Sequence, residues 1–172
     1  MNSNTVRVGL IGLGGVCSAV HYPGFSRIPD VEIVGLCDPD ADLLAKRQSE
    51  WGIDTGYTDA RRFFQEVKPD AVAIAVPNIH HRKLVLRAIE TGCHVLCEKP
   101  LGMTVPETVE MYDAARAADV RHMTAFTYRF VPGITYIKSL VDSGALGDIR
   151  HARFQRLQDW GETSIGWRQY KE

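Results

Sequence analysis

Short apolar runs alternate with amphipathic stretches along the first 126 residues of the chain. The runs are Val6–Leu13, Val31–Cys37, Ala71–Val76 and His94–Cys97, and each is followed by helix-like sequence. Near-continuous apolar strands between helices are typical of a parallel sheet that helices cover on both faces. The pattern therefore predicts an α/β fold built on a doubly wound parallel sheet.

Capping signals support the helices between these strands. Asp38 and Pro39 predict an N-cap and a first helical position after the second run. A capping box over Thr104–Glu107 predicts a helix that continues to about Ala118. Segment 78–92 predicts another helix, because its apolar residues recur at helical spacing. The residues of this apolar face are Leu84, Val85, Ala88 and Ile89.

The pattern changes after Phe126. A helix over about Pro132–Val141, a glycine-rich turn and a strand over about Asp148–Leu157 are predicted. We expect two domains, with residues 1–126 forming the first and residues 127–172 the incomplete beginning of a second α/β domain. The last strand would lack later strands to pair with, and such an open edge favours self-association. The uncovered apolar residues beside it would be Phe154, Leu157 and Trp160.

Composition excludes several classes of function. The chain has 172 residues, 45% of them hydrophobic, and a formal net charge of −1, which fits one ordinary globular core. Basic and acidic residues are balanced, so no polyelectrolyte surface is predicted for nucleic acid or an anionic membrane. The N-terminus has no signal-peptide pattern, and no apolar run approaches the ~20 residues that span a bilayer. We expect a cytoplasmic protein with a small-molecule partner.

Four cysteines lie inside or beside apolar segments, and they are Cys17, Cys37, Cys93 and Cys97. Their positions indicate reduced, buried thiols in a reducing compartment. Cys93 and Cys97, together with His94, are candidate metal ligands, but their spacing matches no zinc finger or ribbon. Strand alternation places both cysteines on one face and His94 on the other, so core packing without a metal is predicted.

A glycine-rich turn joins the first strand to a helix. Gly12 allows a tight turn, and Gly14 allows the close approach of a pyrophosphate, whose charge meets free N–H groups at a helix N-terminus. The third glycine of this fingerprint is replaced by Cys17, a thiol small enough to pack against the sheet. Glycines also punctuate strand-to-helix turns of other kinds. The predicted cofactor-binding residues of the turn are Gly12, Leu13, Gly14, Gly15 and Val16.

Asp38 ends the second strand about 20 residues beyond the glycine turn, where a carboxylate can accept both ribose hydroxyls of an adenosine. The role of helix N-cap is compatible with this one. A carboxylate at this position would also repel a 2′-phosphate, which favours NAD over NADP.

The strand at 71–76 is followed by Pro77 and Asn78, at the edge of the sheet where ligands collect in open α/β folds. A turn proline and a helix cap explain these two residues fully. They leave His80 and His81 unexplained, although exposed histidines in a first helical turn are common.

Glu98, Lys99 and Pro100 follow the last apolar run and reach the same edge of the sheet. Lys99 could stand beside a nicotinamide ring, pair with a substrate hydroxyl and exchange a proton with it. A solvated pair of Glu98 and Lys99 is the alternative.

In order and spacing, these motifs and the segment over Thr127–Ile149 resemble the glucose-fructose oxidoreductase / inositol dehydrogenase (Gfo/Idh/MocA) family. The resemblance extends from Val6 to about Arg168 and depends above all on Glu98–Pro100. It implies an N-terminal Rossmann domain and a C-terminal α/β domain, built on an open antiparallel sheet, for substrate binding and dimerisation. It also implies a homo-oligomer and NAD(P)-dependent hydride transfer on a sugar, cyclitol or related polyol.

The resemblance also implies roles for single residues. Lys99 matches the lysine that serves catalysis and binds substrate, and Arg129 matches an arginine that lines the active site in some members, with a structural role as the alternative. The departures are Cys17 and Ala75–Val76, where many members have a threonine before the proline. The residues that match the cofactor site are Gly12, Gly14, Gly15, Asp38, Pro77, Asn78, His81, Glu98 and Lys99.

The chain stops before the segment in which the family carries a catalytic Asp and His. We therefore expect the cofactor-binding part of an NAD(P)-dependent oxidoreductase, inactive by itself. A non-catalytic dinucleotide-binding sensor or regulatory module is the alternative, and the missing Asp and His would favour it. A small-molecule methyltransferase also uses a glycine turn and an acid after its second strand, but Glu98–Pro100 argues against that class.

Overall fold

The structure is a computed structural model that describes residues 5–155 and residue 157. The chain divides into two compact units, Met1–Ala125 and Phe126–Glu172. We call them unit 1 and unit 2 and describe each by itself. Among the described residues, no helix is both long enough and apolar enough to cross a bilayer.

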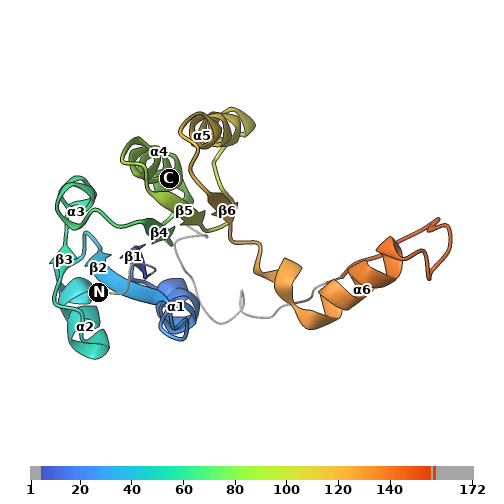
Figure 1. Cartoon of the computed structure of the whole chain (residues 1–172), viewed down its shortest axis with the longest axis horizontal. Coiled ribbons are helices and arrows are strands. Elements are labelled where there is room, and N and C mark those ends of the chain that lie inside the picture. The colour runs from blue at the N-terminus through green and yellow to red at the C-terminus, as the bar shows by residue number, and fades with distance from the viewer. Residues whose placement is uncertain (1–4, 156, 158–172) are drawn as a thin grey trace. The chain divides into compact units, whose positions relative to one another are not determined.

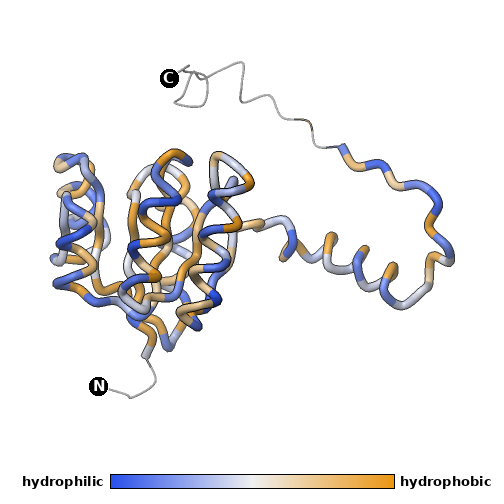
Figure 2. Tube along the Cα trace, turned by 90° about the horizontal axis from the view of Figure 1, so that it is seen from above, coloured by the Kyte–Doolittle hydropathy of each residue, from blue (hydrophilic) through white to orange (hydrophobic). Residues whose placement is uncertain are grey.

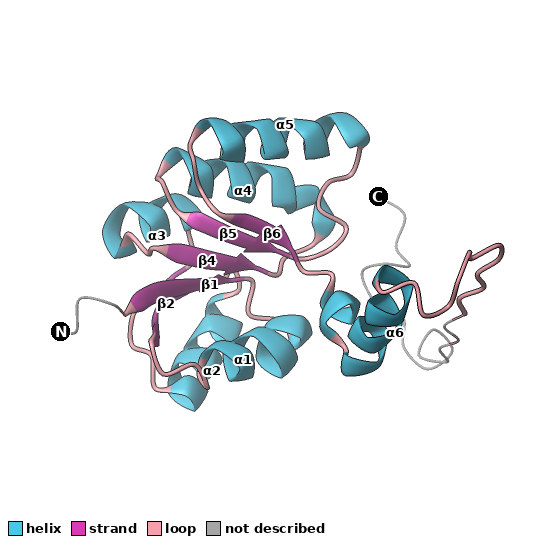
Figure 3. Cartoon of the chain, turned by 45° about the vertical axis from the view of Figure 1, so that its right-hand side comes forward, coloured by secondary structure: helices cyan, strands magenta, loops and turns pink. Residues whose placement is uncertain are grey.

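Unit 1 is built on one sheet of six parallel strands, in the order β3-β2-β1-β4-β5-β6 (Figure 3). The predicted α/β fold with a doubly wound parallel sheet is therefore confirmed. The strand order reverses between β1 and β4, which are neighbours in the sheet although two strands separate them in the chain. The strands are β1 Val6–Ile11, β2 Val31–Cys37, β3 Gly56–Tyr57, β4 Ala71–Ile74, β5 His94–Cys97 and β6 His122–Thr124.

Helices cover both faces of the sheet (Figures 1 and 3). One face carries α1 (Tyr22–Phe25), which continues a π-helical turn over Cys17–His21, and α2 (Ala41–Trp51). The opposite face carries three helices, because the chain crosses to that side after β3. They are α3 (Ala60–Val67), α4 (His81–Glu90), which follows a 3-10 turn over Asn78–His80, and α5 (Val105–Ala117).

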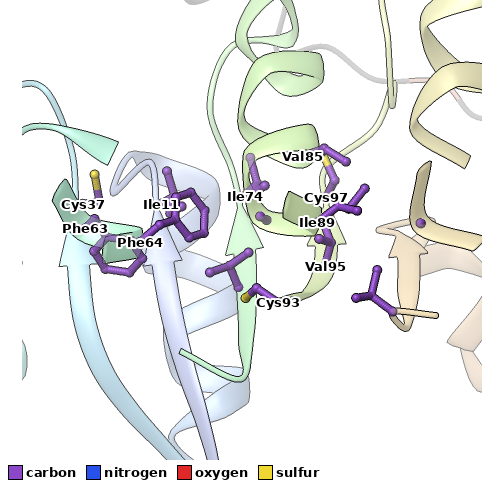
Figure 4. Packing of buried hydrophobic residues seen from close by; sticks show 14 of the residues in the cluster. Ile11, Cys37, Phe63, Phe64, Ile74, Val85, Ile89, Cys93, Val95 and Cys97 are labelled. Atoms are coloured by element: carbon purple, nitrogen blue, oxygen red, sulfur yellow. The ribbon is translucent and has the colours of Figure 1, made fainter. Parts of the chain in front are cut away.

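Each face of the sheet has its own apolar core. Under α3, α4 and α5 the largest buried side chains are Phe63 and Phe64, whose rings meet edge to face at 5.6 Å. In Figure 4 these two rings lie near Ile11 of β1. The core under α1 and α2 includes Leu10 and Leu44. Burying side chains of this size supplies the main favourable term in the folding of unit 1, about 1.5–3 kcal/mol for each one fully buried.

The cysteines lie in these two cores, as predicted. Cys17 packs in the core under α1 and α2, and the other three pack in the core under α3, α4 and α5. All four are free and buried, while His94 faces outward. No group of three or more metal-binding side chains occurs in the part of the chain that the structure describes. The prediction that these thiols are buried in the core, with His94 on the other face, is confirmed.

Two predicted helix caps are wrong. Asp40, not Asp38, caps α2, since its carboxylate accepts hydrogen bonds of 3.0 Å from the N–H groups of Asp42 and Leu43. Asp38 cannot serve there because its own carboxylate is already bound to other backbone groups. Asn78 makes no side-chain cap either, because the backbone first forms a 3-10 turn, whose N-cap residue is Pro77. The prediction that Thr104 caps α5 is confirmed.

In unit 2 the structure describes a 3-10 turn over Thr127–Phe130 and helix α6 over Pro132–Asp142. Figure 2 shows hydrophobic positions spaced along this helix between hydrophilic ones. The strand predicted over Asp148–Leu157 is wrong for the described residues in that range, which form no strand. A strand is stable only when its N–H and C=O groups pair with a neighbour, and none of the described residues of unit 2 offers one.

The apolar surface predicted beside that strand is present in the described residues. Phe154 is 79% exposed and Leu157 is 90% exposed. Trp160, the third residue of the predicted surface, lies outside the described residues.

Candidate functional site

The strand register gathers the candidate residues at the carboxyl edge of the sheet. Ile11 of β1 pairs with Cys37 of β2 and with Ile74 of β4, and Ile74 pairs in turn with Cys97 of β5. The residues that follow these four positions therefore emerge side by side. This edge includes the place between β1 and β4 where the strand order reverses, which is where open α/β sheets bind ligands.

The glycine turn after β1 has the backbone that its sequence predicts. Gly12 has a φ of +83°, and a Cβ added to it would lie 2.5 Å from the carbonyl oxygen of Ala75, so only glycine fits. A Cβ added to Gly14 or Gly15 would meet nothing within 4 Å, so the space in front of both is open. The N–H groups of Gly14, Gly15 and Val16 donate to no described residue. Such a turn can receive an anion such as a pyrophosphate.

Asp38 is joined to the glycine turn directly. Its Oδ2 accepts a hydrogen bond of 2.8 Å from the N–H of Leu13, and its Oδ1 accepts one of 3.0 Å from the N–H of Asp40. Each oxygen keeps a free lone pair, and the residue is 8% exposed. The carboxylate can therefore still accept the hydroxyls of a ribose. Leu13 contributes only backbone groups, because its side chain is fully buried.

Arg47 of α2 supports the same turn, although its sequence context did not reveal this. Its Nε donates to the carbonyl oxygen of Leu13 at 3.2 Å, its Nη1 pairs with Glu50 at 2.6 Å, and its guanidinium lies over the ring of Trp51. The only available signal was the spacing of Arg47 and Glu50, which predicts an ion pair on a helix but no contact with a distant turn.

The residues Glu98, Lys99 and Pro100 follow β5 and form what we call the lysine turn. Glu98 Oε1 lies 3.0 Å from Nε2 of His21, and Oε2 of the same carboxylate accepts the N–H of Lys99 at 3.2 Å. Lys99 is exposed, and its ammonium makes no ion pair or hydrogen bond with any residue that the structure describes. Glu98 thus pairs with His21. The alternative from sequence, a solvated pair between the side chains of Glu98 and Lys99, does not form in the structure.

His81 lies beneath this edge and is fully buried. Its Nδ1 lies 2.9 Å from the carbonyl oxygen of Pro100, and its Nε2 lies 2.9 Å from that of Val76. The ring is enclosed and each nitrogen faces a carbonyl oxygen, and the role of His81 at the cofactor site stays a prediction. Pro77 and Asn78 do lie at the surface of the same edge, one exposed and the other partly exposed.

Arg129 belongs to the 3-10 turn of unit 2, where it is exposed. Its backbone N–H donates to the carbonyl oxygen of Phe126 at 3.0 Å. Because unit 2 is described by itself, the contribution of Arg129 to the site stays a prediction.

Cys17, which stands at the third position of the glycine fingerprint, has a structural role in the core. Burial raises its pKa from the ordinary 9.0 to about 12, and the charge of Arg47 lowers it only in part. The thiol is 1% exposed and packs in the core under α1 and α2. A protonated, enclosed thiol is not a nucleophile, so Cys17 serves helix–sheet packing as the missing glycine would.

A parallel sheet in this strand order, a glycine turn after β1 and a carboxylate after β2 define a dinucleotide-binding Rossmann domain. A family model described as "Oxidoreductase family, NAD-binding Rossmann fold" matches residues 6–126. The chain therefore belongs to the Gfo/Idh/MocA family of oxidoreductases.

Several relatives match over most of the length of this chain. It is 34% identical to the D-glucoside 3-dehydrogenase of Escherichia coli, over 97% of this chain and 47% of that protein. It is 32% identical to the levoglucosan dehydrogenase of Pseudarthrobacter phenanthrenivorans, over 95% of this chain and 44% of that protein. The scyllo-inositol dehydrogenase of Lactobacillus casei, solved with NAD(H) and scyllo-inositol, matches with a TM-score of 0.79 and 25% identity, over 84% of this chain and 43% of that one. The chain thus spans less than half the length of these relatives.

Proposed function

We propose that this chain is the cofactor-binding part of an NAD-dependent oxidoreductase that transfers a hydride to or from a sugar, cyclitol or related polyol. The observation that carries the proposal is one edge of the sheet that combines an open glycine turn, a ribose-type carboxylate and an exposed lysine. The named activities of the relatives, on a glucoside, levoglucosan and scyllo-inositol, support the substrate class.

The residues of the site fit a bound dinucleotide. The free N–H groups of Gly14, Gly15 and Val16 would hold the pyrophosphate, and Asp38 would accept the adenosine ribose hydroxyls. Asp38 carries its charge where NADP has a 2′-phosphate, so NAD is the preferred cofactor. When bound, NAD supplies the hydride acceptor. Pro77 and Asn78 lie beside β4, next to the place where the strand order reverses, and would border the cofactor there.

Lys99 is the proposed catalytic residue. Its ammonium is free of protein partners among the described residues and stands at the carboxyl end of β5. In its neutral amine form a lysine there can hydrogen-bond the reacting hydroxyl of a polyol and accept its proton as the carbon loses a hydride, which leaves the ammonium. In the reverse direction it returns the proton to the carbonyl oxygen. Arg129 is proposed to bind the same substrate from unit 2.

Other parts of the proposal concern the whole protein. The exposed apolar residues of unit 2, Phe154 and Leu157 among them, support a homo-oligomer formed through the second domain, which light scattering at increasing protein concentration would test. The four free, buried cysteines support a cytoplasmic location, because unpaired thiols are typical of a reducing compartment. We expect this chain by itself to bind NAD(H) without appreciable turnover.

The experiment that tests the proposed function compares Lys99→Ala with Lys83→Ala in the full product of the reading frame. Lys83 is an exposed lysine on α4 and serves as the matched control. NADH formation with a panel of polyols should fall by about 10²-fold or more in Lys99→Ala, as for loss of a general base, with little change in NAD⁺ affinity. Parental turnover in Lys99→Ala would refute the role, and NAD⁺ binding without turnover on any polyol would favour a sensor.

A further inference from the structure

The position of Lys99 is set by its backbone. Its ammonium forms no hydrogen bond or ion pair with any described residue, so no polar partner among them holds the tip of the side chain in place. Lys99 follows β5 by two residues and lies outside the sheet, where only its neighbours Glu98 and Pro100 can fix the chain. A catalytic group must be held within a fraction of an ångström of its working position, so the groups that hold these neighbours matter.

On one side, the lysine turn is held by His21. This residue ends the π-helical turn that follows the glycine turn, and it is 6% exposed. Its Nε2 lies 3.0 Å from Glu98 Oε1, a carboxylate oxygen that can accept a hydrogen bond from it, and the other oxygen of the carboxylate accepts the backbone N–H of Lys99. The Glu98 carboxylate therefore bridges the helical segment next to the pyrophosphate site and the backbone of Lys99. A carboxylate held at both oxygens in a partly buried place has little freedom to rotate.

On the other side, the lysine turn is held by His81. Its two ring nitrogens face two carbonyl oxygens, one of Pro100 in the lysine turn and one of Val76 in the turn after β4. Carbonyl oxygens only accept hydrogen bonds, so the ring nitrogen that carries the proton donates to the carbonyl oxygen it faces. Because His81 is fully buried and its ring fills the space between the two turns, it joins them as one unit.

We propose that His21 and His81 are positioning residues that fix the lysine turn from its two sides. Fixing this turn places the side chain of Lys99 at the nicotinamide end of the cofactor. The inference rests on the proposed function for the role of Lys99. Neither histidine touches the reacting atoms. His21 acts through the Glu98 carboxylate and His81 through the Pro100 carbonyl. His21 also connects the lysine turn to the helical segment beside the proposed pyrophosphate site. The cofactor site and Lys99 are therefore held by the same set of contacts.

The test uses the 172-residue chain labelled for NMR spectroscopy. One pair of variants, His21→Leu and His21→Gln, removes or keeps a donor for Glu98, and a second pair, His81→Leu and His81→Gln, does the same for Pro100. His80→Leu is the control, since His80 is exposed and adjacent in sequence. Amide exchange of Lys99 is measured without cofactor, and the shift of the Lys99 side-chain nitrogen is measured on adding NAD⁺.

We expect His21→Leu to speed amide exchange of Lys99 about tenfold, while amides of the central strands keep their protection. The NAD⁺-induced shift of the Lys99 nitrogen should fall to less than about half, with NAD⁺ affinity within about threefold of the parent. The two Gln variants should recover most of the parental values, and His80→Leu should match the parent. Parental exchange and shift in His21→Leu would overturn the inference.

The His81 pair gives an independent outcome. If His81→Leu folds, it should show the same two changes at Lys99, and parental values would overturn the inference for this residue. If it does not fold, the results for His81→Gln and for the two His21 variants decide whether the inference holds. A parent chain that fails to bind NAD⁺ would contradict the proposed function, and amide exchange would still show whether the histidines hold the turn.

Discussion

The two units use apolar residues in opposite ways. In unit 1 the apolar residues of strands and helices are enclosed, and Leu10, Phe63 and Ile74 are 0% exposed. In unit 2 helix α6 has no buried residue, and Phe130 and Tyr136 are 65% and 64% exposed. Both units show apolar residues at regular spacing. Regular spacing therefore identifies the face that favours burial, whereas burial itself needs a packed partner, which the sheet supplies in unit 1.

Truncating one phenylalanine in each unit gives the largest predicted contrast. Phe63→Ala should lower the free energy of unfolding by about 3–5 kcal/mol, because the ring is enclosed by the core under α3. Phe130→Ala, at a 65% exposed position, should change it by less than about 0.5 kcal/mol. Urea unfolding followed by circular dichroism measures both. Equal losses would show that unit 2 has a core of its own.

A glycine substitution in each unit tests the backbone next. Gly12→Ala forces a Cβ to within 2.5 Å of the Ala75 carbonyl oxygen at a φ of +83°, and such strain costs about 1–3 kcal/mol before any clash. It should also weaken NADH binding at least about tenfold, since the glycine turn must shift. Gly133→Ala on α6 meets open space, so it should leave NADH affinity unchanged and should not lower the stability, since alanine favours a helix by up to about 1 kcal/mol over glycine. Thermal unfolding and calorimetric titration of NADH measure the two effects, and an unchanged Gly12→Ala would contradict the proposed turn.

The rate at which a thiol reacts with a labelling reagent should differ between the two units. Burial raises the pKa of Cys37, Cys93 and Cys97 to about 12, as it does for Cys17, so a disulfide reagent at pH 8 should label none of them in the folded chain. A cysteine placed on unit 2 by Ser143→Cys, at an exposed position, should react at once. Rapid labelling of the native thiols would mean that unit 1 opens.

The same pKa values set a pH dependence with a definite sign. In the unfolded chain a thiol deprotonates near its ordinary pKa of 9.0, whereas in the folded chain it keeps its proton to about 12. The unfolded state therefore binds fewer protons between these values, and the stability is fully present below pH 9 and falls as the pH rises toward 12. Urea unfolding at pH 8 and pH 10 should show the loss, and replacing Cys97 with serine should reduce the difference.

Much of unit 1 follows from its sequence. Four strands come from apolar runs, and the glycine turn and Asp38 lie at the predicted edge, because the carboxyl ends of parallel strands must meet there. No apolar run locates β3 or β6, since two and three residues are too short to show a period.

The parts that sequence did not predict depend on contacts between distant residues. Local sequence favours Asp38 as helix cap, but the N–H of Leu13, 25 residues away, binds its carboxylate, and Asp40 caps instead. His21 shows no motif of its own, and its partner Glu98 is 77 residues away. The predicted strand after α6 failed because strand formation depends on a partner, which no local pattern reveals.

Calorimetric titration of the 172-residue chain with NADH and NADPH tests whether unit 1 forms an NAD site with Asp38 at the ribose. We expect one NADH to bind per chain, at least about tenfold tighter than NADPH, which corresponds to about 1.4 kcal/mol. Asp38→Ala should narrow that difference, while Asp54→Ala, at an exposed position beyond α2, should leave it unchanged. Equal affinities for the two cofactors in the parent chain, or no binding of either, would show that Asp38 does not select NAD at this site.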